Sequence, residues 1–152
     1  GVTTIGESAF SDSNIKTIDI PDSVTEIGED AFAYCDFETV VIPDGVTSIK
    51  KGTFSSCNPL RSVTIPDSVT KIEGSAFSGC GSLSEITIPD SVTEIGIRAF
   101  SNCYSLDKVT IPDSVTKIGA EAFFGNYRIS VTYKGETYTY NNLDELYTTQ
   151  ED

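Results

Sequence analysis

Apolar and polar positions alternate along the chain in a unit that returns every 22 or 23 residues. In one copy, Val63 and Ile65 alternate with polar neighbours, which is the period of a half-buried β-strand. Pro66 ends the strand because it has no N–H to donate. Residues 69–72 turn apolar side chains inward again, and we expect the tight apolar step at residues 76–80 to be one helical or 3₁₀ turn. Each unit therefore predicts one coil.

Three residue types mark the repeat by their spacing. Phe stands at 10, 32, 54, 77, 100 and 123, Pro at 21, 43, 66, 89 and 112, and Cys at 35, 57, 80 and 103. A single unit cannot bury its own apolar side, so the copies must stack into a continuous core. Because every coil repeats the same path, its strands are parallel and about 4.8 Å apart. Residues 1–128 therefore predict an α/β repeat solenoid, strand-rich with short helical turns.

Both ends of the chain depart from the repeat. Residues 2–10 match only the second half of a unit, so we expect about five and a half repeats, with the N-terminal one truncated from a longer parent protein. Residues 129–140 alternate around Lys134 and Gly135, which predicts a β-hairpin. Asn142 and Glu145 have the spacing of a capping box that opens a short helix. We expect residues 129–152 to form a C-terminal cap, frayed over residues 148–152, with a linker to a further domain as the alternative.

The repeated unit closely resembles a known family. Residues 88–106 read IPDSVTEIGIRAFSNCYSL, which is similar to the BspA-like leucine-rich repeat, also called the Treponema pallidum type. Residues 131–147 look like the tails of cell-surface members from gut Firmicutes. The resemblance implies a secreted or surface-anchored bacterial protein that binds host matrix proteins, other bacteria or mucosal surfaces. It brings no fixed functional residues, because the repeat residues of this family are structural.

Composition excludes several classes of partner and chemistry. The chain has 23 acidic and 10 basic residues, no His, and a formal charge of -13. This charge argues against binding to nucleic acid or to an anionic membrane surface. No apolar run has the length of about 20 residues that a membrane span needs. Without an imidazole base or a phosphate-binding loop, we expect no catalytic residues, no cofactor and no enzymatic activity.

Three polar columns repeat with the coils. We expect the Cys column to be buried free thiols, with disulfides or a metal site as alternatives. The Asp column is Asp22, Asp44, Asp67, Asp90 and Asp113. We expect these carboxylates to cap local turns, with bridging Ca²⁺ as the alternative. The Thr rows indicate strand preference, and an ice-binding surface is the less favoured interpretation.

The outward strand positions are the candidate binding surface. Column one is Thr17, Thr39, Ser62, Glu85 and Lys108, and column two is Asp19, Val41, Thr64, Thr87 and Thr110. Column one varies from coil to coil whereas the core columns hold, so packing does not select its residues. We expect this face to be concave and to bind an extracellular protein of the host matrix or of a bacterial surface. Tyr34, Tyr104 and Tyr127 form a second candidate patch.

These observations favour a non-enzymatic extracellular recognition or adhesion module. Two alternatives remain open: a passive stalk that displays another domain, and a carbohydrate-binding module that uses the Tyr patch. We expect no metal site, and a monomer or weak end-to-end association.

Overall fold

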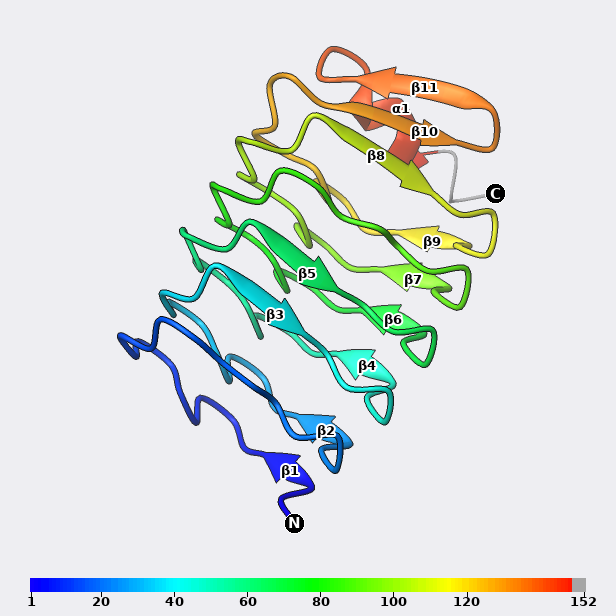
Figure 1. The fold of residues 1–152 in the computed structure, drawn as a ribbon. Helices are drawn as coiled ribbons and strands as arrows, with labels where there is room; N and C mark the ends of the chain where they lie inside the picture. The colour runs from blue at the N-terminus through cyan, green and yellow to red at the C-terminus, as the bar shows by residue number, and fades with distance from the viewer. Residues whose placement is uncertain (149–152) are drawn as a thin grey trace.

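The protein is a stack of flattened coils that rises from the N-terminus to the C-terminus (Figure 1). The structure, a computed structural model, describes residues 1–148. Residues 149–152, which make up most of the segment predicted to fray, lie outside the described residues, and Thr148 is the last residue of the only helix in the described part.

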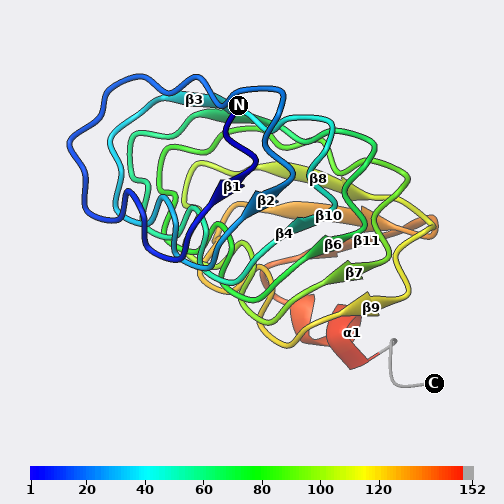
Figure 2. The ribbon, with the colours of Figure 1, turned by 90° about the horizontal axis from the view of Figure 1, so that it is seen from below.

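Short strands lie on two sides of the stack of coils (Figures 1 and 2). The first side, the strand face, comprises β3 (Thr39–Val41), β5 (Ser62–Thr64), β8 (Lys108–Ile111) and β10 (Ser130–Tyr133). The second side, the short-strand face, comprises β1 (Thr4–Ile5), β2 (Glu26–Ile27), β4 (Ser48–Ile49), β6 (Lys71–Ile72), β7 (Glu94–Ile95) and β9 (Lys117–Ile118). Strand β11 (Glu136–Thr139) and helix α1 (Leu143–Thr148) follow at the C-terminal end.

Neighbouring coils pair in parallel, as the sequence predicted. The order β4-β6-β7-β9 is continuous, and each residue pairs with the residue 23 positions later, as Ile72 does with Ile95. The strand face is less regular. β3 pairs with β5 and β8 pairs with β10, but residues 85–88 between them form no strand. The strand face is therefore two separate ladders on one surface.

The step at residues 76–80 is a series of β-turns, and the predicted helical turn is wrong. Ser75 and Gly79 have φ angles of 57° and 78°, in the left-handed region, and the same two positions are left-handed in every coil. Alternate N–H groups close turns within the coil, as from Cys80 to the carbonyl of Phe77. The others donate to the next coil, as from Phe77 to Ala99 at 2.8 Å. A helix would use every one of these donors internally and leave nothing to join the coils.

Stacked Phe rings fill the core beside the turns. Successive centroids lie 5.3–5.7 Å apart with interplanar angles of 3–9°. Phe77 and its counterparts from Phe32 to Phe123 are fully buried, whereas Phe10 in the first coil is 41% exposed. The spacing is close to that of the bonded strands, so one ring per coil keeps the whole column in contact.

The Cys column consists of buried free thiols. Each sulfur donates to a Phe carbonyl of the preceding coil, as from Cys57 Sγ to Phe32 at 3.0 Å and from Cys103 Sγ to Phe77 at 3.2 Å. In the last coil the side-chain amide of Asn126 makes this bond to Phe100 at 2.9 Å. Burial raises the pKa of the Cys57 thiol to about 12. The column therefore supplies neutral donors that join the coils.

Ser, rather than the preceding Asp, makes the side-chain bond at the turn after the strand face. The hydroxyls of Ser68, Ser91 and Ser114 donate to Val carbonyls of the preceding coil at 2.7–2.8 Å. The turn itself is closed by the backbone, from Val69 N–H to the carbonyl of Pro66 at 3.1 Å. The Asp side chains are exposed and make none of the side-chain bonds of the described residues, so their predicted capping role is wrong.

The C-terminal hairpin and helix close the stack, as predicted. β10 continues the strand face beside β8, and β11 folds back on β10 in antiparallel pairing. The N–H of Phe123, which has no following coil, donates to the Tyr147 hydroxyl at 3.0 Å. Tyr133 donates its hydroxyl to the Val115 carbonyl at 2.6 Å, the bond that Ser makes elsewhere. Two Tyr hydroxyls therefore replace bonds that a further coil would provide.

The predicted capping box is only partly present. α1 begins at Leu143, so Asn142 stands at the expected position. Its side-chain oxygen, however, accepts a hydrogen bond from the backbone N–H of Thr139 at 2.7 Å, and Thr139 precedes the helix. Asn142 therefore fixes the connection between β11 and α1. The boundary predicted between residues 128 and 129 stays a prediction.

Candidate recognition surface

All ten predicted site residues lie on the strand-face side of the coils. Nine are exposed and Ser62 is half-buried, while the Val and Ile side chains between them point into the core. The ladder of β3 and β5 places Thr39 opposite Ser62 and Val41 opposite Thr64. Lys108 and Thr110 belong to β8, on the second ladder. The structure thus brings the two columns together on one face.

Shallow grooves between coils join the predicted residues that lie outside strands. One groove of about 270 Å³ has Asp19, Thr39 and Val41 along its walls. A second, of about 350 Å³, places Thr87 beside Lys108 and Thr110. The grooves therefore connect the two coils that lack a strand on this face to β3 and β8 beside them.

The strand face is mixed in charge and carries one exposed apolar residue. Val41 is 63% exposed at a position where the other coils have Asp or Thr. Ion pairs join neighbouring coils along its edge, from Lys16 to Asp36 at 3.3 Å and from Arg61 to Glu38 at 3.8 Å. Exposed pairs of this kind contribute at most about 1 kcal/mol each, so they orient side chains more than they stabilise the fold.

The predicted Tyr patch is only partly present. Tyr104 and Tyr127 occupy the same position in adjacent coils, whereas Tyr34 lies three coils from Tyr104 at a left-handed turn position. Tyr127 packs edge-on against Tyr140 of the cap at a centroid distance of 5.0 Å. Beside that pair lies an exposed ring that the sequence reasoning missed, Phe124. Its signal was available, because the equivalent position in the other coils is Ser or Ala.

Residues 1–148 contain no cluster of three or more His, Cys, Asp or Glu side chains placed to hold a metal ion. Over the same range, no helix combines the length and the apolar character needed to cross a membrane.

Comparison with known families accounts for the repeat. The model of the BspA type leucine-rich repeat region matches residues 2–140 in six copies. The chain belongs to this family. Leucine-rich repeat domains in general serve as scaffolds for protein interactions. No curated protein matches the chain.

Solved bacterial structures share the fold of this BspA-type chain. A leucine-rich repeat protein from Bacteroides ovatus is 31% identical with a TM-score of 0.69, over 86% of this chain and 40% of that one. The leucine-rich repeat protein of T. pallidum is 29% identical with a TM-score of 0.65, over 86% and 51%. A leucine-rich cell surface protein from Faecalibacterium prausnitzii is 25% identical with a TM-score of 0.60, over 89% and 52%. The chain thus spans about half or less of each of these proteins.

Proposed function

We propose that this chain is a non-enzymatic recognition module of a bacterial surface protein, and that it binds an extracellular protein through the strand face. The membership of the family and the cell-surface description of the Faecalibacterium prausnitzii protein support the location. The proposed surface is the set Thr17, Asp19, Thr39, Val41, Ser62, Thr64, Glu85, Thr87, Lys108 and Thr110.

The observation that carries the proposal is the contrast between the two layers of the strand face. Beneath it, Val40, Val63 and Val109 are buried and nearly identical from coil to coil. Above it, the exposed column changes from Thr39 to Lys108, although each is the first residue of its strand, β3 or β8. A scaffold that holds its core constant and varies its exposed residues is suited to recognition.

Charge reversal on the strand face tests the proposal. We would immobilise the folded chain and measure its binding to fibronectin, fibrinogen, laminin and mucin by biolayer interferometry at physiological salt. We expect saturable binding to at least one of them. The double variant Glu85→Lys with Lys108→Glu should weaken this binding by about tenfold, because it inverts two exposed charges and keeps the net charge.

A matched variant lies on the opposite face of the same two coils. Glu94 and Lys117 are paired neighbours on β7 and β9. Their double reversal should leave binding unchanged if the strand face is the site. An equal loss from both double variants would contradict the placement, and no binding by the folded chain would favour the alternative of a passive stalk.

A further inference from the structure

We infer that the C-terminal cap carries a second binding site, an aromatic and acidic pocket that takes an organic cation. The pocket lies between the turns of the last coil and α1, and has a volume of about 290 Å³. Phe124 and Gly125 come from the coil, and Tyr140, Leu143, Asp144 and Tyr147 come from the cap. This site is separate from the strand face and does not depend on the function proposed for that face.

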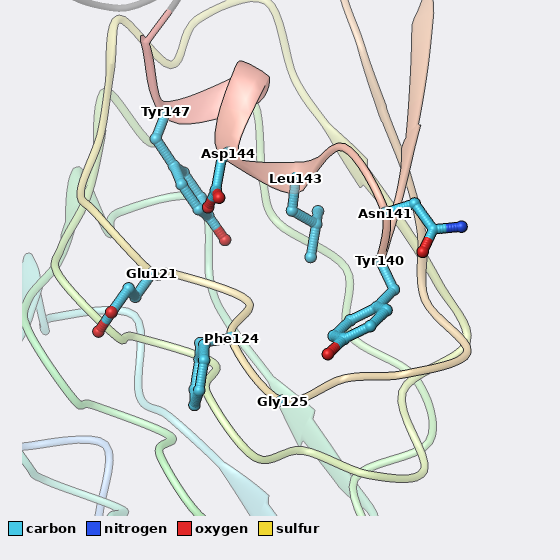
Figure 3. Close-up of a pocket in the computed structure, with 8 residues that line it drawn as sticks. All are labelled: Glu121, Phe124, Gly125, Tyr140, Asn141, Leu143, Asp144 and Tyr147. Atoms are coloured by element: carbon cyan, nitrogen blue, oxygen red, sulfur yellow. The ribbon is translucent and has the colours of Figure 1, made fainter.

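Aromatic rings surround the open space of the pocket. Figure 3 shows the rings of Phe124 and Tyr140 on opposite sides, with Leu143 and Tyr147 closing the cap side and Asn141 pointing away. Phe124 is 55% exposed and Tyr140 is 48% exposed, so both rings are accessible to a ligand. The ring of Tyr140 is held in place because Tyr127 packs edge-on against it.

Packing of the solenoid does not explain Phe124. The equivalent residues of the other five coils are Ser11, Ala33, Ser55, Ser78 and Ser101. The repeat therefore folds with a small side chain at this position, and the core Phe of the last coil is the neighbouring Phe123. An exposed aromatic residue placed beside a cavity, where the fold needs only Ser, points to a ligand.

The negative charge of the residues that line the pocket favours a positively charged ligand. Its walls contain Asp144 and Glu121 and no basic residue. Glu121 is paired with Arg98 at 2.5 Å, whereas no ion pair of residues 1–148 involves Asp144. Burial first, and then the charges of Asp144 and Glu121, raise the pKa of Tyr147 to about 12, so both carboxylates lie close enough to act on a ring that lines the pocket.

Aromatic faces beside an uncompensated carboxylate favour a cation over a neutral sugar. Ring faces attract ammonium and guanidinium groups through their quadrupole, and a nearby carboxylate adds direct attraction. A neutral sugar would gain nothing from the charge of the carboxylate, and Asn141, the amide at this site, points away from the space (Figure 3). The cation has two possible sources: a Lys or Arg side chain of a protein partner, or a small quaternary amine.

Amide-detected NMR titration of the ¹⁵N-labelled chain tests this site. The probes are N-acetyl-argininamide, tetramethylammonium chloride and neutral methyl β-glucoside, at constant ionic strength. We expect saturable shifts confined to the last coil and the cap with at least one cation. Saturation by argininamide alone identifies a protein side chain as the source, and saturation by tetramethylammonium identifies a quaternary amine.

Three variants separate the site from general attraction to an acidic protein. Phe124→Ser restores the residue of the other coils, so the fold is retained, and it should weaken binding by about tenfold. Asp144→Asn should weaken it by about fivefold. Asp67→Asn removes the same charge from an exposed turn far from the cap and should change the affinity less than twofold.

The inference is overturned by any of three results. The first is the absence of saturable shifts with either cation, and the second is tighter binding of the glucoside than of both cations. The third is an equal loss of affinity in Asp67→Asn and Asp144→Asn, which would show attraction by net charge alone. The double reversal of Glu85 and Lys108 should leave these titrations unchanged, so failure of one site is distinguishable from failure of the other.

Discussion

The bond that closes the stack at its C-terminal end gives the sharpest test of how this solenoid is capped. Tyr133 and Val115 are both buried, and the 2.6 Å hydroxyl-to-carbonyl bond between them stands where Ser makes the same bond in other coils. Tyr133→Phe keeps the ring and removes only the hydroxyl group that donates this bond. A buried carbonyl that loses its partner costs about 1–2 kcal/mol. At about 2–4 °C per kcal/mol for a chain of this size, the melting temperature should fall by about 2–8 °C.

Thermal unfolding followed by circular dichroism measures the loss, and amide hydrogen exchange locates it. Amides of β10 and β11 should exchange about tenfold faster in Tyr133→Phe, because the cap opens more readily. Tyr127→Phe is the control, since that hydroxyl belongs to a residue that is 65% exposed and its loss should shift the melting temperature by less than about 1 °C. Ser91→Ala removes the equivalent bond within the stack, at 2.7 Å, and should cost a similar amount. If Tyr133→Phe melts like Tyr127→Phe, the hydroxyl does not hold the cap.

Three further predictions concern the core columns. Phe77→Ala removes a fully buried ring in the middle of the stack, so it should cost about 3–5 kcal/mol and lower the melting temperature by at least about 6 °C. Phe10→Ala removes a ring that is already 41% exposed and should cost less than half as much. Equal losses in the two variants would show that the stack does not act as a column. Native protein should resist labelling by a thiol reagent at pH 8 and react fully when denatured, because all four Cys are buried. The raised pKa of Cys57 implies stability that is complete below about pH 9 and is lost as pH rises toward about 12, since the unfolded chain then releases protons that the folded chain retains. Thermal melts between pH 8 and pH 11 should show this decline, and a decline just as steep in Cys57→Ser would contradict the assignment.

Much of the fold could be predicted because the sequence of one coil recurs in six copies. The recurring Phe, Pro and Cys positions define the period, and the period defines parallel strands, a buried column and a stack. The end of the repeat was equally visible, since the alternation around Lys134 and Gly135 differs from every preceding unit and forms the hairpin β10-β11. Each of these features depends on local pattern, which is what a sequence records directly.

Features that depend on the neighbouring coil were predicted less well. Residues 76–80 suggested a helical turn because their apolar spacing is short, but the donors that would complete a helix bond to the next coil instead. Asp67 was expected to cap its turn, yet Ser68 beside it makes the bond to the coil below. Both errors arise because one coil, considered alone, does not show where the hydrogen-bonding groups of its neighbour lie.

The candidate surfaces divide in the same way. The sequence identified the outward residues of the strand face, because alternation shows which side chains leave the core, and all ten lie on that face. It did not identify the pocket of the cap, whose walls join Phe124 of the last coil to Tyr140 and Asp144 beyond the hairpin. By itself the sequence determined the period, the buried columns and the two faces, since these follow from the order of apolar and polar residues. Only the tertiary structure decided which bonds join the coils, how two Tyr hydroxyls finish the stack, and where rings and carboxylates meet, because these contacts form between segments that sequence order does not place together.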